Sequence, residues 1–249
     1  MYRTLPAKIY QDFLGVQKGE VPVAAVVHGS WGAVLVRQFA EAHLHGLREA
    51  GPPILLGRYH GTAVALANVY GAPLAADMTF ILVRAGVRMV LQTGFFGGLR
   101  QDQDGDTLLV PDSVVPGEGV ARSFMRRGPL VPTEIADLRA TLSELGTPEG
   151  GTLLSTASIT AETDGAVRRW MLDGYAGVDL ESAATVAVAR ALGAKVGVAL
   201  HASDNLARGE SFFDERVGGE QVRARRRQRV SRMLELCLDY AVKAAPERR

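Results

Sequence analysis

The amino-acid sequence predicts an α/β fold in which a largely parallel sheet is covered by helices on both faces. Short apolar runs rich in Val, Ala and Leu alternate with longer segments of helical period, a rhythm typical of such sheets. The 249 residues are 47% hydrophobic and 22% charged, which provides enough apolar side chains for a sizeable core. Neither a Pro/Ser-rich linker nor a repeat divides the sequence, so we expect residues 1–249 to form one domain.

The first half of the chain is expected to contain four strands and three helices. The apolar runs that predict strands are residues 23–27, 63–68, 88–93 and 107–110. Helical period predicts helices over 33–50, 74–85 and 133–145, the first ended by a Gly-Pro-Pro sequence and the third capped by Thr133. A glycine turn over 94–98 is expected after the third strand.

The second half repeats this alternation. Strands are expected over 152–156, 177–180 and 195–201, and helices over 164–172, 182–192 and 217–244. The last helix is long and amphipathic.

The composition argues against nucleic-acid and membrane partners. A formal net charge of +1 is too small to attract the protein to nucleic acid or to a membrane surface. No uncharged apolar run approaches the roughly 18 residues that span a bilayer. The first residues lack the apolar core of a signal peptide. Cys237 is the single cysteine, which fits a reducing compartment, so we expect a cytoplasmic protein. The five histidines show no metal-ligand spacing, so we expect no metal and no cofactor.

Two of the expected strands end in unusually polar sequence, where ligands of open α/β sheets collect. Asp179 and Glu181 flank Leu180 at one end, and Ser203 and Asp204 follow another strand. We expect one acid of the first pair to face a crevice, where a carboxylate suits sugar hydroxyls. A desolvated carboxylate at the other end suits a general acid. The same acids are also typical of helix caps and of partners for arginines, and pattern alone leaves both interpretations open.

Five motifs occur in a fixed order over roughly residues 20 to 240. They are Tyr-Gly-Ala-Pro at 70–73, Gly-Phe-Phe-Gly-Gly-Leu at 94–99, Gly-Val-Asp-Leu-Glu-Ser-Ala-Ala at 177–184, Leu-Gly-Ala-Lys at 192–195 and Ser-Asp-Asn at 203–205. This ordered set resembles the nucleoside phosphorylase and nucleosidase superfamily. The resemblance implies a three-layer α/β fold with a mixed, twisted central sheet, and cleavage of the N-glycosidic bond of a nucleoside.

The resemblance also implies roles for particular residues. Asp204 would be the catalytic residue that stabilises or protonates a purine nitrogen, and Glu181 would bind the ribose 2′- and 3′-hydroxyls. Leu180 would pack beneath the sugar, and Asp179 stands where the family has a glutamate. Ser203, Gly97 and Phe95 complete the expected substrate-binding set.

The expected phosphate site departs from the family pattern. Phosphate-using members carry Gly-Asp-Pro-x-Arg after the first strand, where this chain has His-Gly-Ser-Trp-Gly-Ala at 28–33. An arginine and a hydroxyl that they carry at the glycine loop are Gln92 and Phe95 here. Arginine is the usual bidentate phosphate ligand. We therefore expect Gly29, Ser30 and Gln92 to bind inorganic phosphate weakly, with Arg37 as the substitute cation.

These observations favour a nucleoside phosphorylase that prefers purines, because Asp204 is present and the uridine-reading Gln and Arg have no counterpart in residues 155–162. One alternative is a nucleosidase, in which water replaces phosphate, although the carboxylate that hydrolytic members place after the first strand is not evident. Another is a nucleoside-binding relative with little activity. The resemblance implies a homo-oligomer, a hexamer or a dimer, in which residues 3–14 contribute to a neighbour's pocket.

Three further features each have two interpretations. His28 and His201 fit either a pocket wall or a structural role. Phe95 and Phe96 fit either base stacking or core packing. The arginine-rich run over 223–229 is more typical of a solvated or intersubunit helix face than of an anion site. By resemblance, Arg226 or Arg227 matches an arginine that assists the catalytic Asp204.

Overall fold

Four buried parallel strands form the centre of the sheet in the computed structural model, which describes residues 2–17, 19–51, 53–125, 128–214 and 219–246. They are β1 (Ala24–Gly29), β4 (Thr62–Val69), β5 (Met89–Gly98) and β10 (Lys195–Asn205). β1 lies between β4 and β5, and β10 pairs with the other side of β5. β1 is buried along its whole length, as its Ala-Val composition predicts for a strand covered on both faces.

Shorter strands extend the sheet and make it mixed. β2 (His45–Glu49) and β3 (Ile54–Tyr59) add antiparallel strands at one edge, and β9 (Gly177–Asp179) pairs antiparallel with the end of β5. β8 (Thr152–Ser155) and β7 (Ser113–Pro116) follow in parallel, and β6 (Leu108–Leu109) pairs antiparallel with β10. The predicted mixed α/β fold is confirmed.

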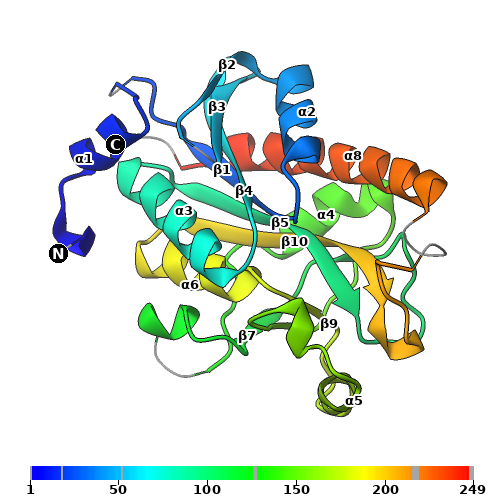
Figure 1. The fold of residues 1–249 in the computed structure, drawn as a ribbon. Coiled ribbons are helices and arrows are strands. Elements are labelled where there is room, and N and C mark those ends of the chain that lie inside the picture. The colour runs from blue at the N-terminus through cyan, green and yellow to red at the C-terminus, as the bar shows by residue number, and fades with distance from the viewer. Residues whose placement is uncertain (1, 18, 52, 126–127, 215–218, 247–249) are drawn as a thin grey trace.

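Helices cover both faces of this sheet (Figure 1). One hydrophobic cluster includes α1 (Ala7–Phe13), α3 (Ala72–Ala85) and α6 (Ser182–Ala191). The opposite cluster includes α2 (Val34–His43), α4 (Ala136–Leu142) and α8 (Glu220–Ala244). α5 (Asp164–Leu172) packs beside β8 and β9 in a smaller third cluster. Short 3-10 helices lie at Tyr2–Thr4, Ala121–Ser123, Ser143–Leu145, Ile159–Ala161 and Leu206–Arg208.

The helix predicted over 33–50 is wrong beyond His43. The chain leaves helical geometry at Leu44, which is extended, and continues as strand β2. Gly46, at a φ of +62° that glycine adopts easily, lies where the register of β2 against β3 shifts. The helical period of the segment did not reveal that β2 and β3 form an edge hairpin, and β3, β7 and α1 are additional to the predicted elements.

The two central strands at the site are longer than predicted. Residues 94–98 were predicted as a turn, but they continue β5 to Gly98, and residues 202–205 continue β10 to Asn205. Both extensions are paired to each other with one register shift between Ala202 and Asp204. The predicted cap Thr133 is also wrong, because α4 begins at Ala136 and the Thr133 hydroxyl bonds Val196 instead. Residues 217 and 218 of the last predicted helix lie outside the described residues.

Candidate active site

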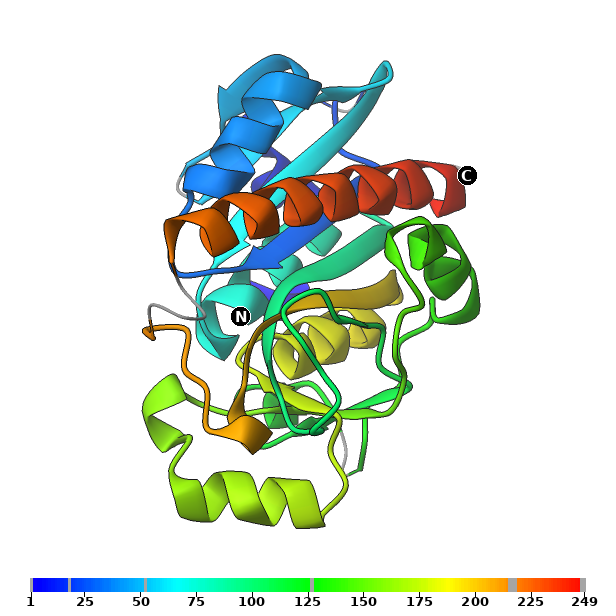
Figure 2. The same ribbon diagram turned by 90° about the vertical axis from the view of Figure 1, so that its right-hand side faces the viewer.

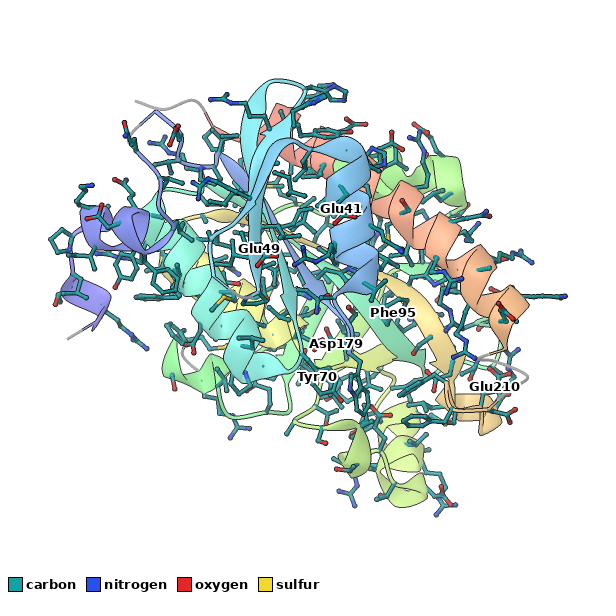
Figure 3. All side chains as sticks on the ribbon, turned by 45° about the horizontal axis from the view of Figure 1, so that its top comes forward. Glu41, Glu49, Tyr70, Phe95, Asp179 and Glu210 are labelled. Carbon is teal, nitrogen blue, oxygen red and sulfur yellow. The ribbon has the colours of Figure 1, made fainter. Side chains whose placement is uncertain are left out.

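A crevice of about 700 Å³ opens where β1, β5, β9 and β10 end. Its walls are the loop after β1, the start of α2, the extension of β5, the start of α6, and the first turns of α8. Figure 3 shows Phe95, Asp179 and Tyr70 near one another at the lower end of α2. The crevice brings together nine of the residues predicted from sequence: Gly29, Ser30, Phe95, Gly97, Asp179, Leu180, Glu181, Ser203 and Asp204.

Asp179 and Glu181 are both buried but have different surroundings. Asp179 accepts hydrogen bonds from the Ser155 hydroxyl and the Ser182 backbone, which anchor it at the start of α6. Glu181 accepts one hydrogen bond, from the Gly71 backbone at 2.7 Å. Burial raises the pKa of the Glu181 carboxyl, and the charge of Asp179 raises it further. Glu181 is therefore the member of the pair with acceptor capacity left for a ligand.

Close backbone approach keeps the Glu181 carboxylate in the crevice. A Cβ at Gly29 would lie 2.6 Å from Glu181 Oε2, so any larger residue would displace the carboxylate. Gly94 has a φ of +146°, and a Cβ there would lie 2.6 Å from the Gly29 carbonyl oxygen. The two glycines therefore allow β1 and β5 to approach each other beneath the carboxylate.

Asp204 lies at the end of β10 with 7% of its surface exposed. It accepts hydrogen bonds from the Ser203 hydroxyl and from the Phe212 backbone at 3.0 Å. Burial raises its pKa, while these hydrogen bonds and the charge of Arg226 act in the opposite direction. The Arg226 guanidinium also donates to the Ser203 carbonyl at 2.6 Å. Asp204 is thus held in a site where its protonated form is favoured by desolvation.

Glu162 is a crevice residue that the sequence analysis did not single out. It follows the short helix Ile159–Ala161, and no described residue donates a hydrogen bond to its carboxylate. Burial raises the pKa of Glu162 to about 7, with a smaller contribution from the charge of Asp204. In the sequence, Glu162 is recognisable only as an acid that follows strand β8. Pattern alone therefore could not have distinguished it from a surface acid.

Of the expected phosphate ligands, Gln92 does not line the crevice. It is fully buried, accepts a hydrogen bond from the Thr185 hydroxyl and donates one to the Thr93 carbonyl. Gly29 and Ser30 do line it, although the Ser30 hydroxyl already donates to Asn68 at 2.7 Å. Arg37 is not a substitute cation: it is exposed and forms an ion pair with Glu49. Neutral histidines provide no charge either, because burial lowers the pKa of both His28 and His201 to about 4.

The aromatic residues separate into a buried group and an exposed group. The Phe95 ring lies edge-on between His28 and His201, with centroid distances of 5.8 and 6.4 Å, and it lines the crevice. Phe96 is 1% exposed and belongs to the core. At the mouth, Trp31 packs against Tyr70 at 5.2 Å and is joined by the adjacent rings of Phe212 and Phe213. Sequence reasoning missed this aromatic mouth because its members come from three loops.

Among the described residues, no group of three or more His, Cys, Asp and Glu side chains could hold a metal ion. No helix within the described part of the chain has the length and apolar character needed to cross a membrane.

Comparison with known proteins decides the family. A family model described as "Phosphorylase superfamily" matches residues 23–240. The chain belongs to this superfamily. A guanosine phosphorylase from Halorubrum lacusprofundi is 25% identical over 209 residues, which cover 80% of this chain and 85% of the relative. The crystal structure of a uridine phosphorylase from Vibrio fischeri ES114 has the same fold, with a TM-score of 0.72, 20% identity, and coverage of 89% of this chain and 95% of that one.

The superfamily match identifies a nucleoside phosphorylase-type enzyme, with the guanosine phosphorylase as a relative in sequence and the uridine phosphorylase as a relative in fold. Nucleoside phosphorylases of this family take phosphate as a substrate and need no cofactor. The resemblance stated from sequence is thereby confirmed.

Proposed function

We propose that this enzyme cleaves the N-glycosidic bond of a purine nucleoside, with Asp204 acting on the base and Glu181 holding the ribose. The observation that carries the proposal is that both carboxylates are buried and line the same crevice. Glycosidic cleavage generates an oxocarbenium-like ribose and a base with developing negative charge. A carboxyl that retains its proton at the base lowers this barrier, and a carboxylate at the ribose hydroxyls orients the sugar.

The other crevice residues support these two roles. In the proposed complex Leu180 packs beneath the sugar. Asp179 holds the start of α6 through the hydrogen bond from the Ser182 backbone. Ser203 donates to Asp204 and so fixes the rotamer of the acid. Phe95 and Gly97 form the wall against the nucleoside. Ribose hydroxyls that donate to Glu181 would favour its ionised form and so lower its pKa on binding.

Purine is the proposed base class. In the proposed complex Asp204 acts on a ring nitrogen, and Glu162, which lines the same crevice close enough to feel the charge of Asp204, is a second polar group for the base. The guanosine phosphorylase relative is consistent with a purine substrate. We expect guanosine and inosine to be cleaved faster than uridine.

We propose weak binding of inorganic phosphate at Gly29 and Ser30, because the cations of the usual site are missing and Gln92 is committed to internal hydrogen bonds.

A nucleosidase is the second candidate. The apolar ring of Phe95 and the two neutral histidines favour it, since none of these groups attracts an anion. Self-association and a cytoplasmic location also remain part of the proposal.

The test is nucleoside cleavage with and without millimolar phosphate, using guanosine, adenosine and uridine. Asp204→Asn should lower kcat by about 10²–10⁴-fold, the usual contribution of a general acid. Glu181→Gln should mainly raise KM, because a ribose contact is weakened. Asp164→Asn, which removes an exposed carboxylate on α5, is the control and should leave both constants unchanged. Full activity of the Asp204 variant would overturn the assignment.

A further inference from the structure

The arginines of α8 have unequal partners. Arg225 and Arg229 form ion pairs with Asp106, and Arg232 pairs with Glu144 and Glu235. Arg226 donates to the Ser203 carbonyl beside Asp204. Arg223 and Arg227 form no ion pair or side-chain hydrogen bond with a described residue, and both line the crevice. These two are therefore the α8 arginines of the crevice that are available to a ligand.

Arg223 and Arg227 are four residues apart and so lie on the same face of the helix. Like charges at this spacing repel each other. No described carboxylate offsets that repulsion by pairing with either guanidinium. An anion between them would remove the repulsion and gain charge-assisted hydrogen bonds from both.

Arg227 lies close to the start of α2, which follows Ala33. Arg227 and Leu35 line both the crevice and a smaller adjoining cavity against α2. Figure 2 shows the first turns of α8 next to the start of α2. α2 begins without a side-chain cap, so the amides of its first turn lack a side-chain acceptor there. Gly29 and Ser30, at the end of β1, line the same crevice.

Asp179, Glu181 and Asp204 are buried carboxylates of the same crevice, and Asp204 lies beside Arg226 of α8. An anion would be repelled by these carboxylates and attracted to Arg223 and Arg227. We propose that Arg223 and Arg227 form a relocated phosphate site, which holds inorganic phosphate or a phosphate group carried by the nucleoside ligand. This inference rests on the proposed function. In it, α8 supplies the cations that phosphate-using members carry at the positions of Ala33 and Gln92, where this chain has no charged side chain.

The experiment is calorimetric titration of the whole protein, without turnover, at low ionic strength. Inorganic phosphate, guanosine and guanosine 5′-monophosphate are titrated into the wild type, Arg223→Gln, Arg227→Gln and the double variant. Arg225→Gln is the matched control, because it removes the same charge from the same helix but outside the crevice, and Asp106 keeps Arg229 as a partner. Thermal unfolding of each variant confirms that it is folded.

Each single substitution should weaken binding of the phosphate group by about three- to tenfold, and the double variant by more, since exposed guanidinium contacts are partly screened. Arg225→Gln should stay within about twofold of the wild type. Loss confined to inorganic phosphate identifies a co-substrate site, and loss confined to the monophosphate identifies a ligand phosphate. Equal binding by the wild type and the double variant in both titrations would overturn the inference. Failure of the proposed function would appear separately, as absent nucleoside cleavage with phosphate binding intact.

Discussion

Glu181 and Asp179 show how two acids of the same type acquire different tasks from their neighbours. Asp179 is held by two donors from β8 and α6, whereas Glu181 has one donor and faces the crevice. The sequence motif identified both acids, but it could not say which has free acceptor capacity. Glu162 was not identifiable at all, because its importance comes from burial next to Asp204 and not from a motif. Gln92 fails as a ligand for a similar reason: one of its hydrogen-bond partners, Thr185, lies on α6, far away in the sequence.

Gly29 should be intolerant of even a small side chain. Gly29→Ala places a Cβ 2.6 Å from Glu181 Oε2, so the carboxylate must move away from the ribose. A misplacement of about 1 Å can cost about 10²-fold in rate, and we expect kcat/KM to fall by about 10–100-fold. Gly32→Ala is the matched control in the same loop, because a Cβ there meets no atom within 4 Å. Equal kcat/KM for the two variants would show that Glu181 is not constrained by Gly29.

Glu162 should influence the pH dependence of cleavage. Its pKa of about 7, raised by burial and by the charge of Asp204, means that it loses its proton near neutral pH. Glu162→Gln removes this titration, so the kcat/KM profile of the variant should lose a step near pH 7 that the wild type shows. Below pH 6 the variant should resemble the wild type, because Glu162 is then neutral. A step near pH 7 that persists in Glu162→Gln, with Asp164→Asn as reference, would argue against this role of Glu162.

At the scale of elements, strands and helices with a clear period were predictable and edge structure was not. The helix predicted over 164–172 coincides with α5, and the strand predicted over 63–68 lies within β4. The β2–β3 hairpin was missed because β2 is an exposed edge strand whose residues also fit a helical period. The extensions of β5 and β10 depend on pairing with each other, which no local pattern contains. These extensions bring Gly97 and Asp204 into the crevice.

The position of α8 depends on its buried stripe, and the proposed arginine pair depends on α8. Leu234 is 1% exposed and packs in the cluster between α8 and the sheet. Leu234→Ala should lower the free energy of unfolding by about 2–5 kcal/mol, through lost burial and the cavity that remains. Val222→Ala is the control on the same helix, because Val222 is exposed, and it should change stability little. Urea denaturation of both variants gives the comparison, and equal midpoints would contradict the packing described.

At the scale of the whole molecule, the layered mixed sheet followed from the alternation of apolar and amphipathic segments together with the family motifs. The strand order did not follow from the alternation alone, because β9 reverses direction against β5 through only two paired positions. This short pairing nevertheless brings the Asp179–Glu181 segment to the end of β5, whose other edge pairs with the end of β10, so that both line the crevice. The site is thus a consequence of long-range topology, even though most of its residues could be named beforehand.

The final prediction concerns self-association. Two regions expose large apolar side chains: Ile9 and Phe13 on α1, with 50% and 59% exposure, and Trp31 and Phe213 at the crevice mouth, with 65% and 70%. Exposed apolar patches of this kind are typical of interaction sites. Figure 1 shows α1 at the opposite end of the sheet from α5, so α1 does not cover the crevice of its own chain. We therefore expect a dimer or larger assembly at micromolar concentration in sedimentation velocity.

Substituting Ile9 and Phe13 together by Ser should shift the protein toward the monomer. Leu172→Ser, which removes an 89% exposed side chain from α5, should not. A monomeric wild type under these conditions would refute self-association.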